Sequence, residues 1–472
     1  MGNNKVKIVV KSGIWYTFSS FIVKSIGFLT TPIFTRILTR EEYGLYSNYA
    51  SWLSTITIFI TLGLGTSFIS AKFDFKEKFD EYVSSTLILS TIITSVWAVI
   101  IFLFHDSISA FTEVESPYLY LMLVYLLLYS AVDMYQAKER YLYGYKKSVF
   151  TSLAIAVSTA GLSVILVKIL SNRLAGRIIG SALPTILIGG FLYYQLMISG
   201  KAVKCHYWKY ALPICLPYIP HVLSLTLLNS MDKVMITKIC GAEDNALYSL
   251  AYSCGAIITL LASSINLAFS PWLGEQLNGK NYDTIFQVSK TYVLIFALGT
   301  CGIMLVTPEL LFFMGGSGYR EAVYVMPPVS LGCVCQFMYS MYVSVEQFNK
   351  RTVGMALASS VAALSNYVLN FIFIRRFGYI AAAYTTLASY FILFMIHVFL
   401  VNRMKIGRIY PTIYFIRVLV FLMIYTIGVN YLYTNSTLRY VCILVYVFIG
   451  LLYISKRKKK IIMLFKGGTS DE

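Results

Sequence analysis

Long apolar segments fill almost the whole chain, and they decide what it can fold into. A helix that crosses a bilayer needs about 20 mostly apolar residues, and we identify fourteen such segments among the 472 residues. They are residues 12–38, 44–70, 82–104, 118–138, 148–170, 175–198, 211–238, 246–271, 288–312, 321–345, 352–374, 378–401, 411–432 and 438–455. Apolar and polar residues do not alternate along them, which favours helices over the strands of a barrel. The chain is therefore predicted to be an all-α integral membrane protein with fourteen transmembrane helices.

The composition excludes a water-soluble protein. Hydrophobic residues make up 58% of the chain and charged residues 13%, and the mean hydropathy is +0.70. Soluble proteins are about 45–50% apolar and about 25% charged, so a soluble fold of this size would expose too much apolar surface. A disulfide scaffold is excluded as well, because the eight cysteines all follow residue 204 and mostly lie inside apolar segments.

Motifs for catalysis and for ATP use are missing from the sequence. It has no P-loop with Lys and Ser/Thr, no paired carboxylates in a loop and no spacing typical of zinc ligands. The connections between the apolar segments are short and leave no room for a soluble catalytic domain. We therefore expect no ATP-driven pumping by this chain, no catalytic residues, no metal and no cofactor, and thus not an enzyme.

The net charge of +18 has two readings. In a soluble protein it would suggest a nucleic-acid partner, whereas in a membrane protein it reflects basic loops on the cytoplasmic side. If the N-terminus is cytoplasmic, 26 of the 39 lysines and arginines fall on that side and 10 on the other. Both termini are therefore predicted to be cytoplasmic, with Lys456–Lys460 near anionic lipid headgroups and no nucleic-acid partner. The apolar run after Lys11 is too long for a signal peptide, so the first span is expected to remain.

An internal repeat divides the chain. Residues 35–47 (TRILTREEYGLYS) and 237–249 (TKICGAEDNALYS) are identical at six of thirteen positions, at an offset of 202. The same offset relates Gly176 to Gly378. Because the repeat covers six spans, an even number, both copies have the same orientation and are related by a pseudo-two-fold axis along the membrane normal.

The repeat predicts the domain organisation. We expect two parallel-related six-helix lobes, residues 1–200 and 201–404, followed by two additional transmembrane helices within 405–455 and a basic cytoplasmic tail, 456–472. Two such lobes enclose a central cavity, and rocking of one against the other gives alternating access.

The first span carries a cation at a depth where charge is costly. Lys24 lies about twelve residues into the span, or ~18 Å at 1.5 Å per residue, where insertion costs roughly 2.5–3.5 kcal/mol. Thr17, Lys24, Thr31 and Thr35 share one helix face. This polar stripe predicts that Lys24 lines the cavity; a structural lysine paired with a carboxylate is the alternative.

The seventh span holds a second polar cluster. His221, Asn229 and Asp232 lie within one broad face, and Lys233 follows directly. The cluster suggests either a site for an anionic group or a proton-coupling pair; the alternative is an internal ion pair, in which Lys233 pairs with Asp232 or with another helix. Three prolines are expected to break the start of this helix: Pro213, Pro217 and Pro220.

Other polar residues within the spans are expected to be structural. Ser359, Asn366 and Asn370 share a face of the eleventh span and are expected to hydrogen-bond neighbouring helices. Arg417 is expected to snorkel to the interface. Three carboxylates near cytoplasmic ends are expected at a basic mouth of the cavity: Asp133, Glu139 and Glu346.

Two segments carry a family resemblance. Residues 12–47 (SGIWYTFSSFIVKSIGFLTTPIFTRILTREEYGLYS) and 229–240 (NSMDKVMITKIC) resemble the openings of the two halves of bacterial oligosaccharide flippases. These belong to the Wzx-like polysaccharide branch of the multidrug/oligosaccharidyl-lipid/polysaccharide (MOP) exporter superfamily. The resemblance implies that an undecaprenyl-pyrophosphate-linked O-antigen or capsule repeat unit moves from the inner to the outer leaflet of the bacterial cytoplasmic membrane, driven by H⁺ or Na⁺.

The resemblance also implies site residues and partners. The charged positions of the family match Lys24 and the pair Asp232 and Lys233. We predict a substrate site from Lys24, Thr31, Thr35, His221, Asn229 and Lys233, with Asp232 as the ion-coupling residue. The partners implied are the lipid-linked oligosaccharide, membrane lipids, a polysaccharide polymerase and chain-length proteins.

Two other functions stay open. A drug or cation antiporter of the same superfamily should have a more acidic cavity, and Lys24 and Lys233 argue against it. A membrane glycosyltransferase or polysaccharide polymerase should have a sizeable outer loop or a carboxylate-bearing loop, and the sequence has neither.

Overall fold

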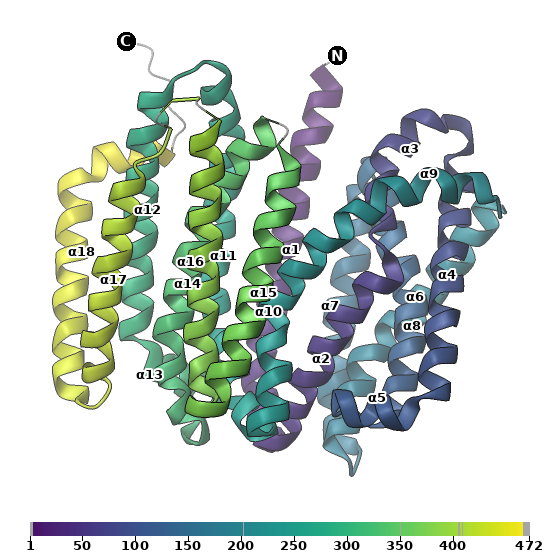
Figure 1. Ribbon diagram of the computed structural model, residues 1–472, viewed down its shortest axis with the longest axis horizontal. Helices are drawn as coiled ribbons and strands as arrows, with labels where there is room; N and C mark the ends of the chain where they lie inside the picture. Colours follow the sequence, from purple (N-terminus) through teal and green to yellow (C-terminus); the bar gives the residue numbers. More distant parts are fainter. Residues whose placement is uncertain (1–2, 202, 350, 405, 408, 466–472) are drawn as a thin grey trace.

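The computed structural model describes residues 3–465, apart from residues 202, 350, 405 and 408. This part of the chain is helical and contains no strand (Figure 1). Its α-helices are α1 (Asn3–Ile37), α2 (Arg40–Thr61), α3 (Phe68–Asp74), α4 (Phe79–Leu103), α5 (His105–Thr112), α6 (Ser116–Tyr141), α7 (Tyr145–Ile169), α8 (Arg173–Gly200), α9 (Cys205–Cys215), α10 (Ile219–Cys240), α11 (Ala242–Asn278), α12 (Tyr282–Leu305), α13 (Thr307–Gly315), α14 (Met326–Phe348), α15 (Thr352–Phe377), α16 (Tyr379–Arg403), α17 (Thr412–Leu432) and α18 (Ser436–Phe465). Short 3-10 segments occupy Leu64–Ser67, Lys76–Lys78, Leu216–Tyr218 and Ser317–Val325.

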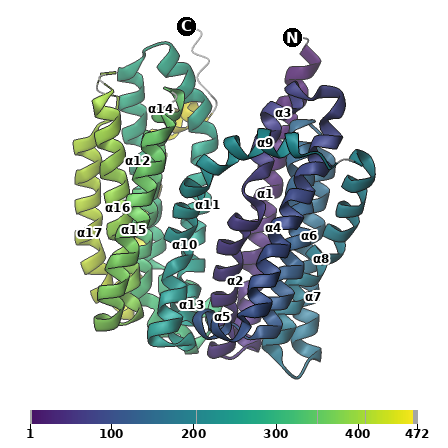
Figure 2. The same cartoon turned by 45° about the vertical axis from the view of Figure 1, so that its right-hand side comes forward.

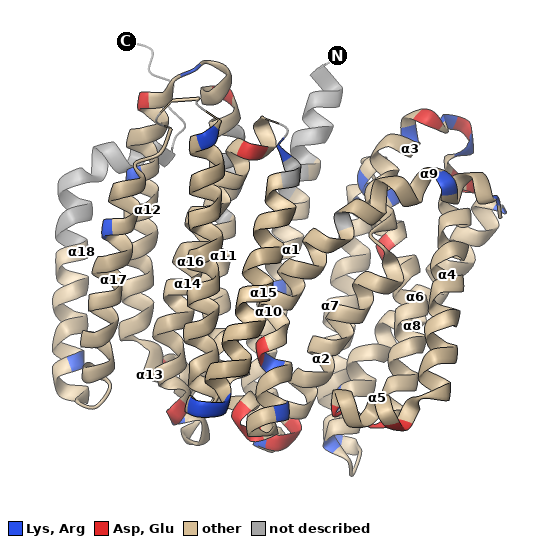
Figure 3. Ribbon diagram, in the orientation of Figure 1, with Lys and Arg blue, Asp and Glu red and all other residues tan. Residues whose placement is uncertain are grey.

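The prediction of an all-α membrane protein is confirmed. Among the described residues, eleven helices are long and apolar enough to cross a membrane, and two bent helix pairs raise this number to thirteen. The apolar part of α18, Ser436–Gly450, is shorter. With α18 as the last, these elements follow the order of the fourteen expected spans. Figure 3 shows that the acidic and basic residues gather at the two ends of the bundle, with few between them.

Two of the expected spans are not straight. The second bends by 45° between α2 and the segment Leu64–Asp74, where Leu62 and Gly63 both have positive φ angles, 46° and 61°. The seventh bends by 57° between α9 and α10. The prolines expected to break it lie at this bend, because a proline ring clashes with the preceding helical turn and donates no hydrogen bond.

The helices form two lobes (Figures 1 and 2). The N-lobe contains α1–α8, and α9 packs on it, since Tyr207, Ala211 and Cys215 join the core around Tyr82. The C-lobe contains α10–α16, with α17 and α18 outside it against α12. Thus α9, beyond the predicted boundary at residue 200, belongs with the N-lobe. Both ends of the described chain lie at one end of the molecule, called here the termini end; the other is the closed end.

The last part of the chain is helical further than expected. We predicted a basic tail over 456–472, but α18 continues to Phe465. Residues 466–472 lie outside the described residues. The common position of the two chain ends agrees with an even number of spans, and their cytoplasmic location stays a prediction.

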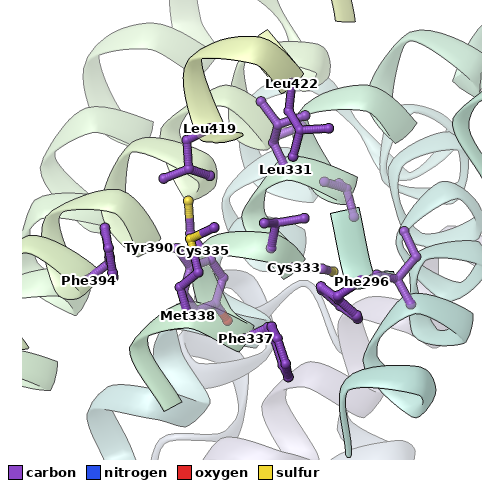
Figure 4. Close-up of a cluster of buried hydrophobic side chains, with 14 of the residues drawn as sticks. Phe296, Leu331, Cys333, Cys335, Phe337, Met338, Tyr390, Phe394, Leu419 and Leu422 are labelled. Atoms are coloured by element: carbon purple, nitrogen blue, oxygen red, sulfur yellow. The ribbon is translucent and has the colours of Figure 1, made fainter. Parts of the chain in front are cut away.

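The helices pack closely within each lobe. In the C-lobe, Phe296, Phe337, Met338 and Tyr390 belong to one large buried cluster (Figure 4). In the N-lobe, α7 and α8 touch at Gly180, where an added Cβ would lie 2.4 Å from Cα of Ser163. Small residues let helix backbones approach in membranes, where packing replaces the hydrophobic effect as the driving force.

Candidate functional site

The lobes meet at the closed end through the end of α1 and the start of α2. Arg36 Nη2 donates to the carbonyl of Phe313 in the C-lobe at 2.9 Å, and the hydroxyl of Thr35 donates to the carbonyl of Met314. Thr35 is only 6% exposed. Of the predicted substrate residues, Thr35 therefore lies in the seam between the lobes and not in an open cavity.

The seam continues where α2 runs beside α11. Asn245 Nδ2 donates to the carbonyl of Gly44 at 2.9 Å, and the hydroxyls of Ser47 and Ser249 lie 2.6 Å apart. An added Cβ at Gly44 would lie 1.8 Å from the carbonyl oxygen of Ala242. The contact therefore requires glycine at position 44, and it joins the two segments of the sequence repeat.

Lys24 lies on the face of α1 that turns toward the C-lobe. At 100° per residue, it is within about 40° of Phe28 and about 20° of Thr35 around the helix axis. Phe28 packs against the C-lobe core, and Thr35 bonds to α13. The Lys24 side chain is exposed, and among the described residues no ion pair involves it. Thr31 lies about 20° away on this face and bonds to the carbonyl of Gly27 at 3.0 Å.

A cavity of about 480 Å³ lies inside the N-lobe, between α1, α2, α6, α7 and α8. It contains one carboxylate, Asp133, and one guanidinium, Arg177. The Arg177 guanidinium carbon lies 3.7 Å and 4.3 Å from the ring centres of Phe34 and Tyr46. The remaining polar or aromatic residues of the lining are Thr30, Tyr46, Tyr125, Tyr129, Gln136, Ser152, Thr159, Ser181 and Thr185.

A cavity of about 440 Å³ occupies the corresponding place in the C-lobe. Helix α6 lines the N-lobe cavity with residues that include 129, 132, 133 and 136. Helix α14 lines the C-lobe cavity with residues that include 329, 332, 333 and 336, each 200 positions later in the chain. The repeat has thus preserved a cavity in both lobes. Their charges differ, because Lys233 is the charged residue of the C-lobe lining.

Asp232 is buried in a polar cluster formed by α10, α11, α15 and α16. Its carboxylate accepts hydrogen bonds from the Tyr248 hydroxyl at 2.6 Å, from Asn370 Nδ2 at 2.6 Å and from the Thr386 hydroxyl. It is 1% exposed. Asn366 and Thr385 complete the cluster through Asn370. The three groups that bond to the carboxylate directly are neutral donors, and among the described residues no cation forms an ion pair with it.

Lys233 points away from Asp232. Its Nζ lies 5.2 Å from the ring centre of Tyr252, and no ion pair joins it to Asp232 among the described residues. Adjacent residues differ by 100° around a helix, so one enters the buried cluster and the other the cavity. The alternative of an internal ion pair between these two neighbours is wrong.

The other two predicted residues of α10 make defined hydrogen bonds. Asn229 lines the C-lobe cavity, where its Oδ1 accepts from the hydroxyls of Tyr252 at 3.0 Å and Tyr390 at 2.8 Å. His221 lies near the bend, and its Nδ1 is 2.9 Å from the Ser359 hydroxyl. The structure thus brings Asn229 and Lys233 together, while His221, Thr35 and Lys24 lie elsewhere.

The expected basic mouth with three carboxylates does not form. Asp133 lines the N-lobe cavity, and Glu139 is buried 3.7 Å from Lys147 Nζ. Glu346 is fully buried and pairs with His397 Nδ1 at 2.7 Å. Arg177 and His397 carried no sequence signal, because each meets its partners only through packing of helices distant in the chain.

The sequence and the structure are similar to known proteins. Residues 9–276 match the family described as polysaccharide biosynthesis protein. A Haemophilus influenzae protein named for the Lsg locus is 25% identical over 299 residues, which cover 61% of this chain and 72% of that protein.

Two solved structures share the fold. The lipid II flippase MurJ in an inward closed conformation matches with a TM-score of 0.68 and 16% identity, over 95% of this chain and 100% of that chain. An inward-facing multidrug resistance MATE family transporter of the MOP superfamily matches with a TM-score of 0.68 and 14% identity, over 82% of this chain and 95% of that chain.

Proposed function

Because the chain belongs to the polysaccharide biosynthesis protein family and has the fold of MOP superfamily transporters, we propose that it moves a lipid-linked oligosaccharide across a membrane. The substrate is an undecaprenyl-pyrophosphate-linked repeat unit, and it passes from the inner to the outer leaflet of the bacterial cytoplasmic membrane. The observation that carries this proposal is Lys24, a cation with no ion pair among the described residues, on the face of α1 turned toward the opposite lobe.

The charge and the cavities suit such a head group. A pyrophosphate with sugars cannot enter hydrocarbon without losing its hydration. Lys24 on α1 and Lys233 on α10, the first long helix of each lobe, replace part of that hydration, since an ammonium binds phosphate as a point charge. Hydroxyl and amide groups in the cavity linings offer hydrogen bonds to sugars. The prenyl chain stays in the lipid.

The arrangement of the lobes supports alternating access. The contacts at Thr35, Gly44 and Ser47 hold the lobes together at the closed end, and the two lobes stand side by side (Figure 2). With cytoplasmic termini, this state receives the head group from the inner leaflet. Release on the other side requires the seam between α2 and α11 to open.

An ion gradient is the energy source we favour, with Asp232 as its site. A bare negative charge is costly when it is buried among neutral groups. Such a carboxylate therefore favours binding a proton, or a cation that its oxygens coordinate. Binding there acts on four helices of the C-lobe at once, since the cluster joins α10, α11, α15 and α16.

One observation favours a different substrate. Asp133 faces the N-lobe cavity and has no ion-pair partner among the described residues, and a carboxylate free of an ion pair can bind a cationic group, although Arg177 lines the same cavity. A drug or cation antiporter is therefore the second candidate. It predicts that Asp133→Asn abolishes efflux of a cationic dye while Lys24→Ala leaves it intact.

The test compares Lys24→Ala with Lys24→Arg in cells that depend on this chain for surface polysaccharide. We expect Lys24→Ala to lose surface glycan and to accumulate the lipid-linked precursor in the inner leaflet, at unchanged protein level. Lys24→Arg, which keeps the charge, should retain most of the export. Normal glycan in the alanine variant would remove Lys24 from the mechanism.

A further inference from the structure

A walled pocket lies on the outer side of the C-lobe at the termini end, apart from the cavities described above. Its volume is about 470 Å³, and α12, α14, α16 and α17 form it together with Gly407 and residues 409–411. The residues that give it its character are Lys290, Tyr342, Asn402, Tyr410, Thr412 and Arg417. Neither cavity of the proposed translocation pathway shares a residue with it.

Among the described residues, the lining of this pocket has two cations and no carboxylate. Lys290 and Arg417 come from different helices, and neither is in an ion pair within the described residues. Lys290 Nζ lies 4.5 Å from the ring centre of Phe286. Asp283, on the same helix as Lys290, is seven residues away, about 10 Å along the axis. The first turn of α17, at Thr412, adds the positive end of a 21-residue helix.

The floor of the pocket is preformed. The hydroxyl of Tyr342 lies 2.8 Å from that of Thr412, and the hydroxyl of Tyr410 donates to the carbonyl of Met341 at 3.0 Å. The rings of Tyr342 and Tyr410 are 4.8 Å apart and both are nearly fully buried. These hydrogen bonds and the burial fix the side chains of the pocket floor in place, and binding pockets are usually largely pre-formed.

An apolar, exposed stripe begins directly beside the cationic rim. Phe421 and Ile424, one and two turns after Arg417 on α17, are 58% and 65% exposed. In a membrane such side chains face acyl chains, so Arg417 lies at headgroup depth. A ligand with a phosphate at the rim and a hydrocarbon tail matches both parts.

We propose that this pocket binds the headgroup of an anionic phospholipid, with the phosphate between Lys290 and Arg417 and an acyl chain along Phe421 and Ile424. Inorganic phosphate shares the headgroup chemistry but makes no use of the apolar stripe. The bound lipid ties α17 to α12 and anchors the helices that follow the second repeat. The site is independent of the proposed transport cycle.

The test uses the detergent-purified full chain and native mass spectrometry. The probes are phosphatidylglycerol, phosphatidylcholine of the same chain length, and inorganic phosphate. Lys290→Ala/Arg417→Ala should bind phosphatidylglycerol about 30-fold more weakly than the wild type, given the usual contribution of two cations near a lipid surface. The matched control is Arg375→Ala/Arg376→Ala. It removes two exposed cations from the last turn of α15, a helix that contributes no residue to the pocket lining. This variant should bind phosphatidylglycerol as the wild type does.

Three results would overturn the proposal. The first is an equal loss of phosphatidylglycerol affinity in the pocket variant and in the control variant. The second is equal binding of phosphatidylcholine and phosphatidylglycerol by the wild type. The third is displacement of the lipid by inorganic phosphate at a similar concentration. If the double variant does not fold, Lys290→Gln and Arg417→Gln are measured singly, and each should weaken binding about fivefold. Lys290→Arg/Arg417→Lys should keep the affinity. None of these outcomes depends on oligosaccharide export.

Discussion

Ser47 and Ser249 share a hydrogen bond between their hydroxyls, 2.6 Å long, and they are equivalent residues of the two repeats, 202 positions apart. Under two-fold symmetry, a residue touches its own counterpart only where the axis passes between them. The pseudo-two-fold axis of the molecule therefore passes through the seam at the closed end. The lobes must part at this point if the site is to open on that side.

A disulfide between these two positions should lock the closed end. In a background without the native cysteines, Ser47→Cys/Ser249→Cys places two sulfur atoms within bonding reach, given the spacing of the hydroxyls. We expect oxidation to stop export and a reductant to restore it. Surface glycan and a mobility shift on a non-reducing gel report the two states.

The two single cysteine variants serve as controls for the lock. Each should export with and without oxidant, because neither can form the cross-link. Full export by the oxidised, cross-linked double variant would mean that the seam between α2 and α11 stays closed throughout transport.

Gly44→Ala should weaken the closed seam. Its Cβ would lie 1.8 Å from the carbonyl oxygen of Ala242, so the backbones of α2 and α11 must separate. We expect slower cross-linking of the cysteine pair at 47 and 249, by about tenfold, since a loss of ~1.4 kcal/mol in the contact has that effect. Gly161→Ala is the matched control, because nothing lies within 4 Å of its added Cβ. Equal cross-linking rates in both variants would show that the seam tolerates the methyl group.

Much of this fold is readable in the sequence because lipid imposes strict rules on it. Every span must satisfy its own backbone hydrogen bonds, so length and hydropathy locate the helices. The bend at Pro217 also follows from local chemistry. The break at Leu62 does not, since Leu62 adopts a positive φ that leucine rarely takes, next to Gly63, and packs against the core around Tyr82.

The site was predictable only where one helix carries the information. The spacing around Lys24 predicts which face of its helix it occupies, whereas the sequence alone left open whether Lys233 pairs with Asp232. Asp133 on α6 and Arg177 on α8 line the same cavity. The residue pattern within either helix does not predict that these two side chains share a cavity. The C-lobe partners of Asp232 are equally distant in the chain, and a single sequence contains no contact information of that kind.

Acid should weaken the attachment of α18 to α13 through Glu309. Burial alone would raise the pKa of this carboxyl, but hydrogen bonds from Arg439 and Tyr440 outweigh burial and lower the pKa below its usual value of 4.5. A lowered pKa in the folded state stabilises the protein above pH 4.5, and this contribution is lost as the pH falls through the folded-state pKa.

The check is thermal unfolding of the wild type and Glu309→Gln between pH 6 and pH 3. The difference in midpoint should be about 1–2 °C at pH 6 and vanish at pH 3; it is small because the Glu309 side chain is 42% exposed. Glu275→Gln, a carboxylate far from this ion pair, should show no such pH-dependent difference. A constant difference at every pH would assign the effect to packing instead of ionisation.

Asp232→Asn should separate ion coupling from folding. The amide has the shape of the carboxylate and still accepts a hydrogen bond from Tyr248 or Asn370, so the cluster keeps most of its contacts. We expect normal protein levels, and flux in vesicles that no longer responds to an imposed proton or sodium gradient. Asp232→Ala should instead unfold at lower temperature, because each buried donor left without an acceptor costs about 1–3 kcal/mol.

The matched control is Asp283→Asn. Asp283 is an exposed carboxylate on α12, so this variant should leave the gradient response intact. A gradient response that persists in Asp232→Asn would place the coupling ion elsewhere, with the Glu346 and His397 pair as the next buried site to examine.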